Sequence, residues 1–253
     1  MILAVALPAA SAPAQIFVDT FDDDTVAAPW TLLIDDQANL SIAESGGVAG
    51  ITSTGGGAGN NDALYLSNHP EFLRLQTSID FSMSIDFRLP RTTDNIPTGQ
   101  ALGLVFGIGA DVDGQNSAAI GAGFGDPFGL GNLGVETVGY RVGDAETVNP
   151  IGSYNPTADA TGTLVIDYVA ATDTLTLTSQ TSGNSDTLVG LVRGQWNAAD
   201  VYVSFGARGR GYSTDPTEVY FDNFKLFEGR TVLPEPGMAG ALALGGLVLR
   251  RRR

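Results

Sequence analysis

The chain has 253 residues, a net charge of −15 and no cysteine, and 33 of its residues are glycine. Without cysteine it can form no disulfide, thiolate zinc site or cysteine nucleophile, and its negative charge disfavours nucleic acid as a partner. Abundant glycine and a charged fraction of only 16% favour short strands joined by tight turns over helices.

The first 14 residues are expected to be a signal peptide. They begin apolar and become rich in small residues, and Ala12, Pro13 and Ala14 before Gln15 fit a small-x-small cleavage site. No positive residue precedes the apolar run, so either the natural start lies upstream or the signal peptide is partial. A buried first strand is the alternative.

Period-two patterns predict that the body, residues 15–230, is built of strands. In FSMSIDFRL, 81–89, apolar and polar residues alternate over nine positions, as in a strand with one buried face. The segments 163–169 and 174–180 alternate similarly, and the short link 170–173 predicts an antiparallel hairpin. Further strands are expected at 15–21, 30–34, 63–67, 101–108, 117–124, 135–142 and 201–208.

No stretch keeps a 3.6-residue period beyond one or two turns, so the body is predicted to be all-β, an antiparallel two-sheet β-sandwich. The glycine-rich segments 45–62 and 123–134 are interpreted as loops. We interpret the first as a flexible connection, with an exposed binding loop as the alternative.

The two ends of the body resemble concanavalin A-like jelly rolls of the laminin-G or glucanase-lectin type. The residues concerned are IFVDTFDD at 16–23, Trp30, and VYFDNFKLFEG at 219–229. The resemblance implies that the first and last strands lie side by side, which would bring Asp19 near Asp222. A galactose-binding-type jelly roll is the alternative.

A structural calcium ion is implied at that junction. Asp222 alternates with Tyr220, Phe224 and Leu226, so its carboxylate is expected on an apolar face, where it must be paired or ligate something. Related jelly rolls hold Ca²⁺ where the terminal strands meet, which implies Asp222 as a ligand and Asp19 as a second. Alternatively, Asp222 caps backbone amides or pairs with an arginine.

Catalytic residues are not expected. Retaining glucanases of this fold carry Glu-x-Asp-x-x-Glu on one strand, because hydrolysis needs two carboxylates about 5–5.5 Å apart. Asp86 and Glu136 each stand alone on their predicted strands, and His69 is the only histidine. We therefore expect a protein that is not an enzyme, with a divergent glycan hydrolase as the alternative.

Glycan binding would need exposed aromatic rings. Trp30 and Trp196 each begin a strand-like run and are predicted to pack in the core. Tyr212, in the polar segment RGRGYSTDP, is the best candidate for an exposed ring, and Arg208 and Arg210 precede it in an otherwise acidic chain. This segment is predicted to be a loop that meets an anionic extracellular polysaccharide, or else a solvated turn.

The last segment, 231–253, resembles the PEP-CTERM sorting signal of Gram-negative bacteria. It carries Pro234, Glu235 and Pro236, then an uncharged run at 237–249, and it ends in Arg250, Arg251, Arg252 and Arg253. As a short hydrophobic helix the run would rise about 20 Å, less than the roughly 30 Å core of a bilayer. The arginines would hold the end on the cytoplasmic side, so transient membrane insertion is expected.

That resemblance implies an exosortase-type processing enzyme as a partner, and export to the cell surface or the exopolysaccharide matrix. An ordinary tail anchor with a basic stop is the alternative for the segment. For the whole chain, a purely structural surface protein without a ligand is a further alternative.

Overall fold

The computed structural model describes residues 15–24, 30–35, 39–55, 62–67, 73–90, 100–111, 113–125, 134–153, 159–227 and 230–232. The predicted signal peptide, His69, the sorting residues Pro234, Glu235, Pro236 and 250–253, and the predicted hydrophobic helix lie outside these ranges. Within them, no helix is both long and apolar enough to cross a membrane.

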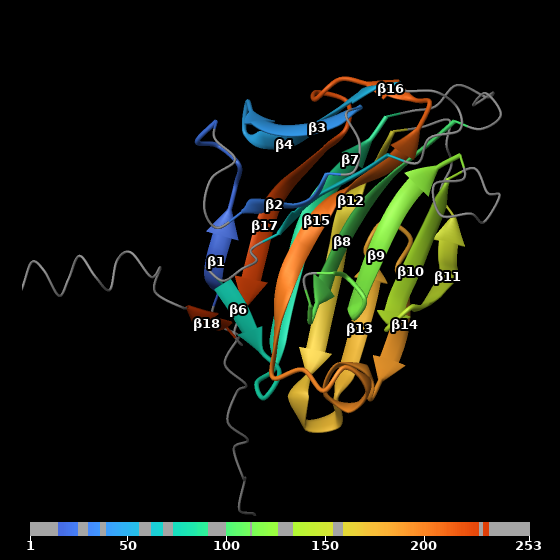
Figure 1. The fold of residues 1–253 in the computed structure, drawn as a ribbon. Helices are drawn as coiled ribbons and strands as arrows, with labels where there is room; N and C mark the ends of the chain where they lie inside the picture. Colours follow the sequence, from blue (N-terminus) through green and yellow to red (C-terminus); the bar gives the residue numbers. More distant parts are fainter. Residues whose placement is uncertain are drawn as a thin grey trace, which may run out of the picture.

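Two antiparallel sheets pack face to face (Figure 1), which confirms the predicted all-β jelly-roll sandwich. The first, called the β7 sheet, has the order β14 (Asn184–Val189), β13 (Thr174–Ser179), β12 (Ala160–Val169), β7 (Phe81–Leu89), β17 (Tyr220–Phe227), β4 (Val48–Thr54) and β16 (Ser213–Thr214), with β1 (Gln15–Asp19) beside β17 and β3 (Leu40–Ser45) beside β4.

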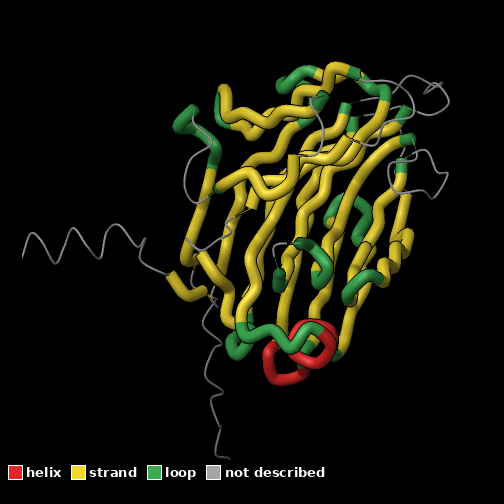
Figure 2. The backbone as a smooth tube through the Cα atoms, in the orientation of Figure 1, coloured by secondary structure: helices red, strands yellow, loops and turns green. Residues whose placement is uncertain are grey.

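The second, called the β8 sheet, has the order β11 (Ala145–Ser153), β10 (Val135–Val142), β9 (Ser117–Phe124), β8 (Ala101–Gly109), β15 (Asp200–Arg210), β5 (Asp62–Ser67) and β2 (Thr31–Asp35). β6 (Leu73–Gln76) pairs with the first residues of β15, and β18 (Arg230–Val232) pairs with β6. Figure 2 shows that strands make up nearly all of the regular structure.

The core lies between the sheets and is built by the predicted alternation. On β7 the residues from Phe81 to Leu89 are buried at every second position. Trp30 is 3% exposed and meets Phe205 of β15 and Phe224 of β17 at ring centroid distances of 4.7 and 5.1 Å, so one indole joins both sheets. Trp196 is buried as well, which confirms both core predictions.

The predicted hairpin is present. β12 and β13 pair in register from Leu164 opposite Ser179 to Val169 opposite Thr174. The link between them forms the short helical turn η1 (Ala170–Thr172), and η2 (Leu191–Gln195) lies at the same end of the sandwich (Figure 2). These two short turns are the only helical elements among the residues described.

The prediction of a loop at 45–62 is wrong for its first half. Val48–Thr54 is strand β4, and Ala49 and Ile51 are fully buried. Gly46 and Gly47, at φ of 64° and 81°, make the tight turn between β3 and β4. Gly50 is needed for a different reason, since a Cβ there would lie 2.7 Å from the carbonyl oxygen of Pro216. Glycine therefore permits close packing here and does not signal a flexible connection.

In the second predicted loop, 123–134, Gly123 and Phe124 complete β9. Gly125 turns the chain at φ 75°, and residues 126–133 lie outside the described ranges.

Candidate functional site

The outward face of the β8 sheet carries unusually few side chains. The inward residues of β8 are Leu102, Leu104, Phe106 and Ile108, all in the core cluster, so alternate positions point away from it. Following the strand pairing gives the outward set, called the glycine face: Gly103, Val105, Gly107 and Gly109 of β8, Ser117, Ala119, Gly121 and Gly123 of β9, Val135, Thr137, Gly139 and Arg141 of β10, and Tyr202, Ser204 and Gly206 of β15.

Packing explains some of these glycines but not all. A Cβ at Gly107 would lie 2.6 Å from the carbonyl oxygen of Ala118, and one at Gly109 would collide with the phenol of Tyr202. At Gly139 the nearest heavy atom would be 3.7 Å away, which is ordinary contact. Glycine in a strand often marks a place where another chain or a ligand approaches the backbone closely. At Gly139 packing does not require glycine, so the approach of a ligand to the backbone is a possible reason for glycine there.

Arg208 and Arg210 extend this face at one end of β15. They continue the outward phase of Ser204 and Gly206, while Phe205 and Ala207 point into the core. β15 runs to Arg210, so the strand predicted at 201–208 is confirmed and extends two residues further, and the predicted loop does not include Arg208 or Arg210.

The two guanidinium groups lie on one face of the sheet, on Cα atoms about 7 Å apart. Neither makes an ion pair or hydrogen bond with the described residues, and the buried Nε of Arg210 has no partner there.

Tyr212 follows β15 and is half-buried. Its ring lies 4.6 Å from that of Phe124 in an edge-on arrangement. Burial raises the pKa of the Tyr212 hydroxyl, and the charge of Glu218 raises it further. Part of the ring therefore packs on the core, and its use as a platform for a sugar stays a prediction.

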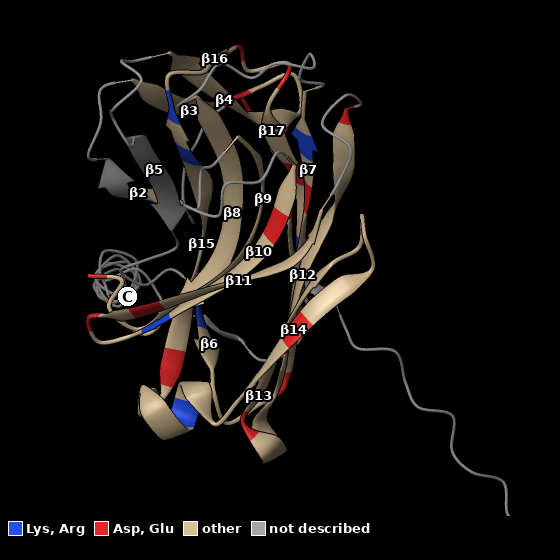
Figure 3. Cartoon of the chain, turned by 90° about the vertical axis from the view of Figure 1, so that its right-hand side faces the viewer, with Lys and Arg blue, Asp and Glu red and all other residues tan. Residues whose placement is uncertain are grey.

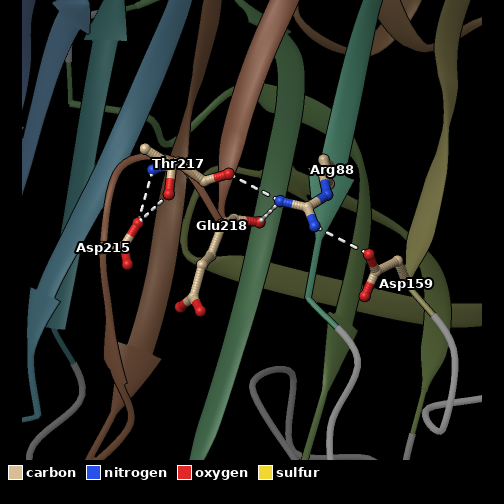
Figure 4. A network of polar contacts seen from close by, with 5 residues as sticks. All are labelled: Arg88, Asp159, Asp215, Thr217 and Glu218. Carbon is tan, nitrogen blue, oxygen red and sulfur yellow. Dashed lines mark hydrogen bonds and ion pairs between the residues drawn. The ribbon is translucent and has the colours of Figure 1, made fainter.

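Arg88 fixes the segment that connects Tyr212 to β17 (Figure 4). Its Nη1 donates to the carbonyl oxygen of Thr217 at 2.7 Å, and its Nη2 donates to Asp159 at 2.8 Å. Asp215 in turn accepts hydrogen bonds from the backbone N–H and the hydroxyl of Thr217. One guanidinium thus ties the turn at 215–218 to the outward face of the β7 sheet.

Asp222 does not lie on the apolar face, so that part of the calcium reasoning is wrong. A bulge interrupts the pairing of β17 with β7 between Asp222 and Lys225, and Asn223 has a φ of 49°. The extra residue reverses the phase of the strand, so Phe221 and Phe224 are buried while Asp222 points outward beside Tyr220. Its carboxylate accepts from the backbone N–H and side-chain amide of Asn223, at 2.6 and 3.0 Å.

The carboxylate opposite Asp222 is Asp86 of β7, not Asp19. Burial raises the pKa of Asp222; hydrogen bonding from the Asn223 backbone opposes this shift, and the charge of Asp86 adds to it. Sequence reading could not find this pair, because its members are far apart in the chain and meet only through the strand pairing.

Asp19 instead accepts hydrogen bonds from residues close to it in the chain. The first and last long strands do lie side by side, with Asp19 opposite Phe224, as the resemblance implied. Asp19 accepts from the backbone N–H of Phe21 at 2.9 Å and from the indole N–H of Trp30 at 2.6 Å. No group of three or more His, Cys, Asp or Glu residues suited to a metal occurs in the described part of the chain.

Carboxylates are scarce on the β8 sheet. Figure 3 shows no charged residue on the described lengths of β8 and β9. On β10 and β15 the only acids are Glu136, which points between the sheets, and Asp200, which pairs with Arg74 at 3.4 Å. Beside the glycine face, Glu146 of β11 pairs with Arg141 at 3.7 Å. The described outward residues of β8, β9, β10 and β15 thus include no pair of carboxylates of the kind that retaining glycoside hydrolysis uses.

The fold and this face define an all-β, two-sheet jelly roll of concanavalin A-like architecture. No protein-family model and no curated protein matches the chain.

Among solved structures, the CBM2 module of the evolved Dit of Lactobacillus casei BL23 phage J-1 is similar at a TM-score of 0.58 and 10% identity, over 87% of this chain and 96% of the module. The endo-1,3-beta-glucanase from Streptomyces sioyaensis has a TM-score of 0.58 and 11% identity, over 90% and 100% of the two chains. The carbohydrate recognition domain of Emp46p has a TM-score of 0.50 and 12% identity, over 80% and 89%. These likenesses establish the fold alone.

Proposed function

We propose that the chain is an exported, non-catalytic module that binds an anionic extracellular polysaccharide across its glycine face. The observation that carries the proposal is the pair Arg208 and Arg210, whose guanidinium groups have no protein partner among the described residues. Half-buried arginines in a chain of net charge −15 would ordinarily find carboxylates within it. A carboxylate or sulfate on a sugar supplies the missing bidentate partner.

The glycine face supports an extended ligand in particular. Val105, Ala119, Gly139 and Ser204 are the partly exposed residues near the centre of this face. Without a side chain at Gly139, a polysaccharide can lie in close contact with the backbone there. The absence of paired carboxylates on β8, β9, β10 and β15 favours binding without turnover. Solved structures with this fold include a carbohydrate recognition domain and two glucanases, which supports a sugar as the ligand.

The experiment compares binding to an acidic and a neutral polysaccharide. We expect the double variant Arg208→Gln and Arg210→Gln to lose at least tenfold in affinity for the acidic polymer, with steep salt dependence in the wild type. Gly139→Tyr should block both ligands, because its ring would fill the face. Thr176→Tyr, on the outward face of the β7 sheet, is the matched control. Unchanged binding in the arginine double variant would refute the proposal.

A divergent hydrolase is the second candidate, and one observation favours it. Asp86 and Asp222 stand directly opposite each other, and such cross-strand pairs have Cβ atoms about 5 Å apart. A raised pKa on Asp222 beside a second carboxylate is what a general acid needs. Release of reducing sugar that disappears in Asp86→Asn and Asp222→Asn would establish this reading. If the protein neither binds a polysaccharide nor releases reducing sugar, the remaining interpretation is a purely structural surface protein.

Sorting belongs to the same proposal. We infer that an exosortase-type enzyme recognises Pro234, Glu235 and Pro236, and that the arginines at 250–253 hold the tail during transient membrane insertion. The protein would then reside at the surface or in the exopolysaccharide matrix of a Gram-negative bacterium. Mass spectrometry of protein recovered from the culture should find a mature C-terminus close to Pro236. Recovery of the intact chain from the cytosol would contradict the inference.

A further inference from the structure

A buried carboxylate with one unused oxygen lies where the two sheets meet at one edge. Glu136 on β10 is fully buried and points between the sheets. Its Oε1 accepts a 2.5 Å hydrogen bond from the hydroxyl of Ser179 on β13. Its Oε2 has no partner, and no ion pair in the described part of the chain involves Glu136. A buried carboxylate is expected to be paired or to coordinate a cation.

The unused oxygen faces a small polar cradle beside Gly152. Gly152 of β11 stands opposite Glu136, next to a bulge in the pairing of β10 with β11. A Cβ on Gly152 would lie 2.7 Å from Glu136 Oε2, 2.5 Å from the side-chain nitrogen of Asn184 and 3.3 Å from the Ser182 hydroxyl. Three polar side chains therefore converge on space that exists only because this residue is glycine.

The cradle opens to solvent on one side. Ser182 and Asn184 are exposed, so an ion can reach Glu136 from the turn that joins β13 to β14. Ser182 Oγ accepts from the backbone N–H of Asn184 at 3.2 Å and keeps a second lone pair for a ligand. The Asn184 amide presents its oxygen to the same space by rotating half a turn about its last bond.

We propose that Glu136, Ser182 and Asn184 bind a divalent, oxygen-seeking cation of the Ca²⁺ class, with water completing the shell. One carboxylate with neutral oxygens suits the weak affinities of extracellular calcium modules, about 10⁻⁴ to 10⁻³ M. The bound ion would join β10 of one sheet to β14 of the other. It would thereby close the sandwich edge that Asn149 and Asp186 already link by a 3.0 Å hydrogen bond. This site is separate from Asp222, Asp19 and the glycine face.

Thermal unfolding with Ca²⁺ alone tests the proposal on the full chain. We expect 10 mM CaCl₂ to raise Tm by about 4 °C over NaCl of equal ionic strength, for a Kd near 1 mM. Glu136→Gln keeps the shape and the Ser179 contact but should abolish the rise. Asp222→Asn should keep all of it, which separates this site from the calcium site implied by resemblance.

Two gentler variants keep the proposal testable where Glu136→Gln fails to fold. Asn184→Ala removes an exposed ligand and should lower the rise by at least half, while Gly152→Ala places a methyl group in the cradle and should abolish it. Titration calorimetry should find one ion per chain at this site, lost in the same variants. No rise in the wild type, or an equal rise in Asn184→Ala and Gly152→Ala, overturns the proposal.

Discussion

The charge of Asp173 is expected to stabilise the end of the sandwich where η1 and η2 lie. It ends η1 with a φ of 47° and is 9% exposed. Its carboxylate accepts from the backbone N–H groups of Arg193 and Gly194, at 3.0 and 2.9 Å, and from the hydroxyl of Tyr168 at 2.9 Å. Two of the donors come from η2 and one from β12, so one side chain fastens η2 to the β12–β13 hairpin.

The pKa values follow from these contacts. Burial raises the pKa of Asp173, but the hydrogen bonds from the backbone of Arg193 and Gly194 and from Tyr168 outweigh burial, so the net pKa is below its ordinary value of 3.8. Burial first, and then the hydrogen bond to Asp173, raise the pKa of Tyr168 to about 12. A carboxyl whose pKa is lowered on folding adds stability above its unfolded pKa and loses it as the pH falls through the folded value.

Asp173→Asn isolates that charge. Asparagine tolerates the left-handed backbone and fills the same space, but its amide has one acceptor oxygen where the carboxylate has two. Hydrogen bonds to a charged group are worth about 1.5–3 kcal/mol against about 1 for neutral ones. Summed over three donors, and reduced for the exposed fraction, the loss is about 3 kcal/mol, or about 9 °C in Tm.

The assay is urea unfolding of both proteins between pH 7 and pH 2.5. The gap should be full at pH 7 and shrink below pH 4, because the wild-type carboxyl becomes protonated while asparagine does not titrate. Thr172→Asn, on the exposed side of η1, controls for the substitution itself. A gap below 1 kcal/mol at pH 7, or one that does not change with pH, would refute the reasoning.

Three other substitutions test separate parts of the structure. Asp222→Asn should stabilise the protein by about 0.5 kcal/mol at pH 7 by removing the cost of burying the charge and the repulsion from Asp86. Because the folded pKa is raised, the gain should vanish below pH 3.8, and a gain that persists at pH 3 would contradict the reasoning. Arg88→Ala should lower the free energy of unfolding by about 1 kcal/mol and speed hydrogen exchange at 217–218. Arg88→Lys should not restore either property, because lysine lacks the two-armed guanidinium that bonds Thr217 and Asp159 together. Gly50→Ala should lower the free energy of unfolding in urea by about 2 kcal/mol, because its Cβ would collide with Pro216. Gly139→Ala, where a Cβ has room, is the control, and equal stability of the two variants would contradict the close contact between residue 50 and Pro216.

Local alternation predicted the strands well because burial acts on each residue separately. β7, β12 and β13 each keep one phase from end to end, so period two in the sequence is period two in burial. The position of Trp30 in the core was also predictable from its place beside a strand-like run. Contacts between distant segments had no such signal. Neither Glu136 with Ser179 nor Asp86 with Asp222 leaves any mark in the sequence near either partner.

The predicted arginine pair keeps the face that its strand gives it, whereas Asp222 does not, and the difference lies in strand register. β15 keeps its pairing with β8 without a bulge from Tyr202 to Arg210, so Arg208 and Arg210 share a face because both belong to the strand. On β17, one residue at a φ of 49° shifts the phase and carries Asp222 from the core face to the outward face. A bulge of one residue reverses every side chain beyond it, and Asn223 differs from its neighbours only by a modest tolerance of the left-handed region. Assigning a polar residue to a face therefore requires an unbroken ladder on both sides of it, which holds for the arginine pair and fails for Asp222.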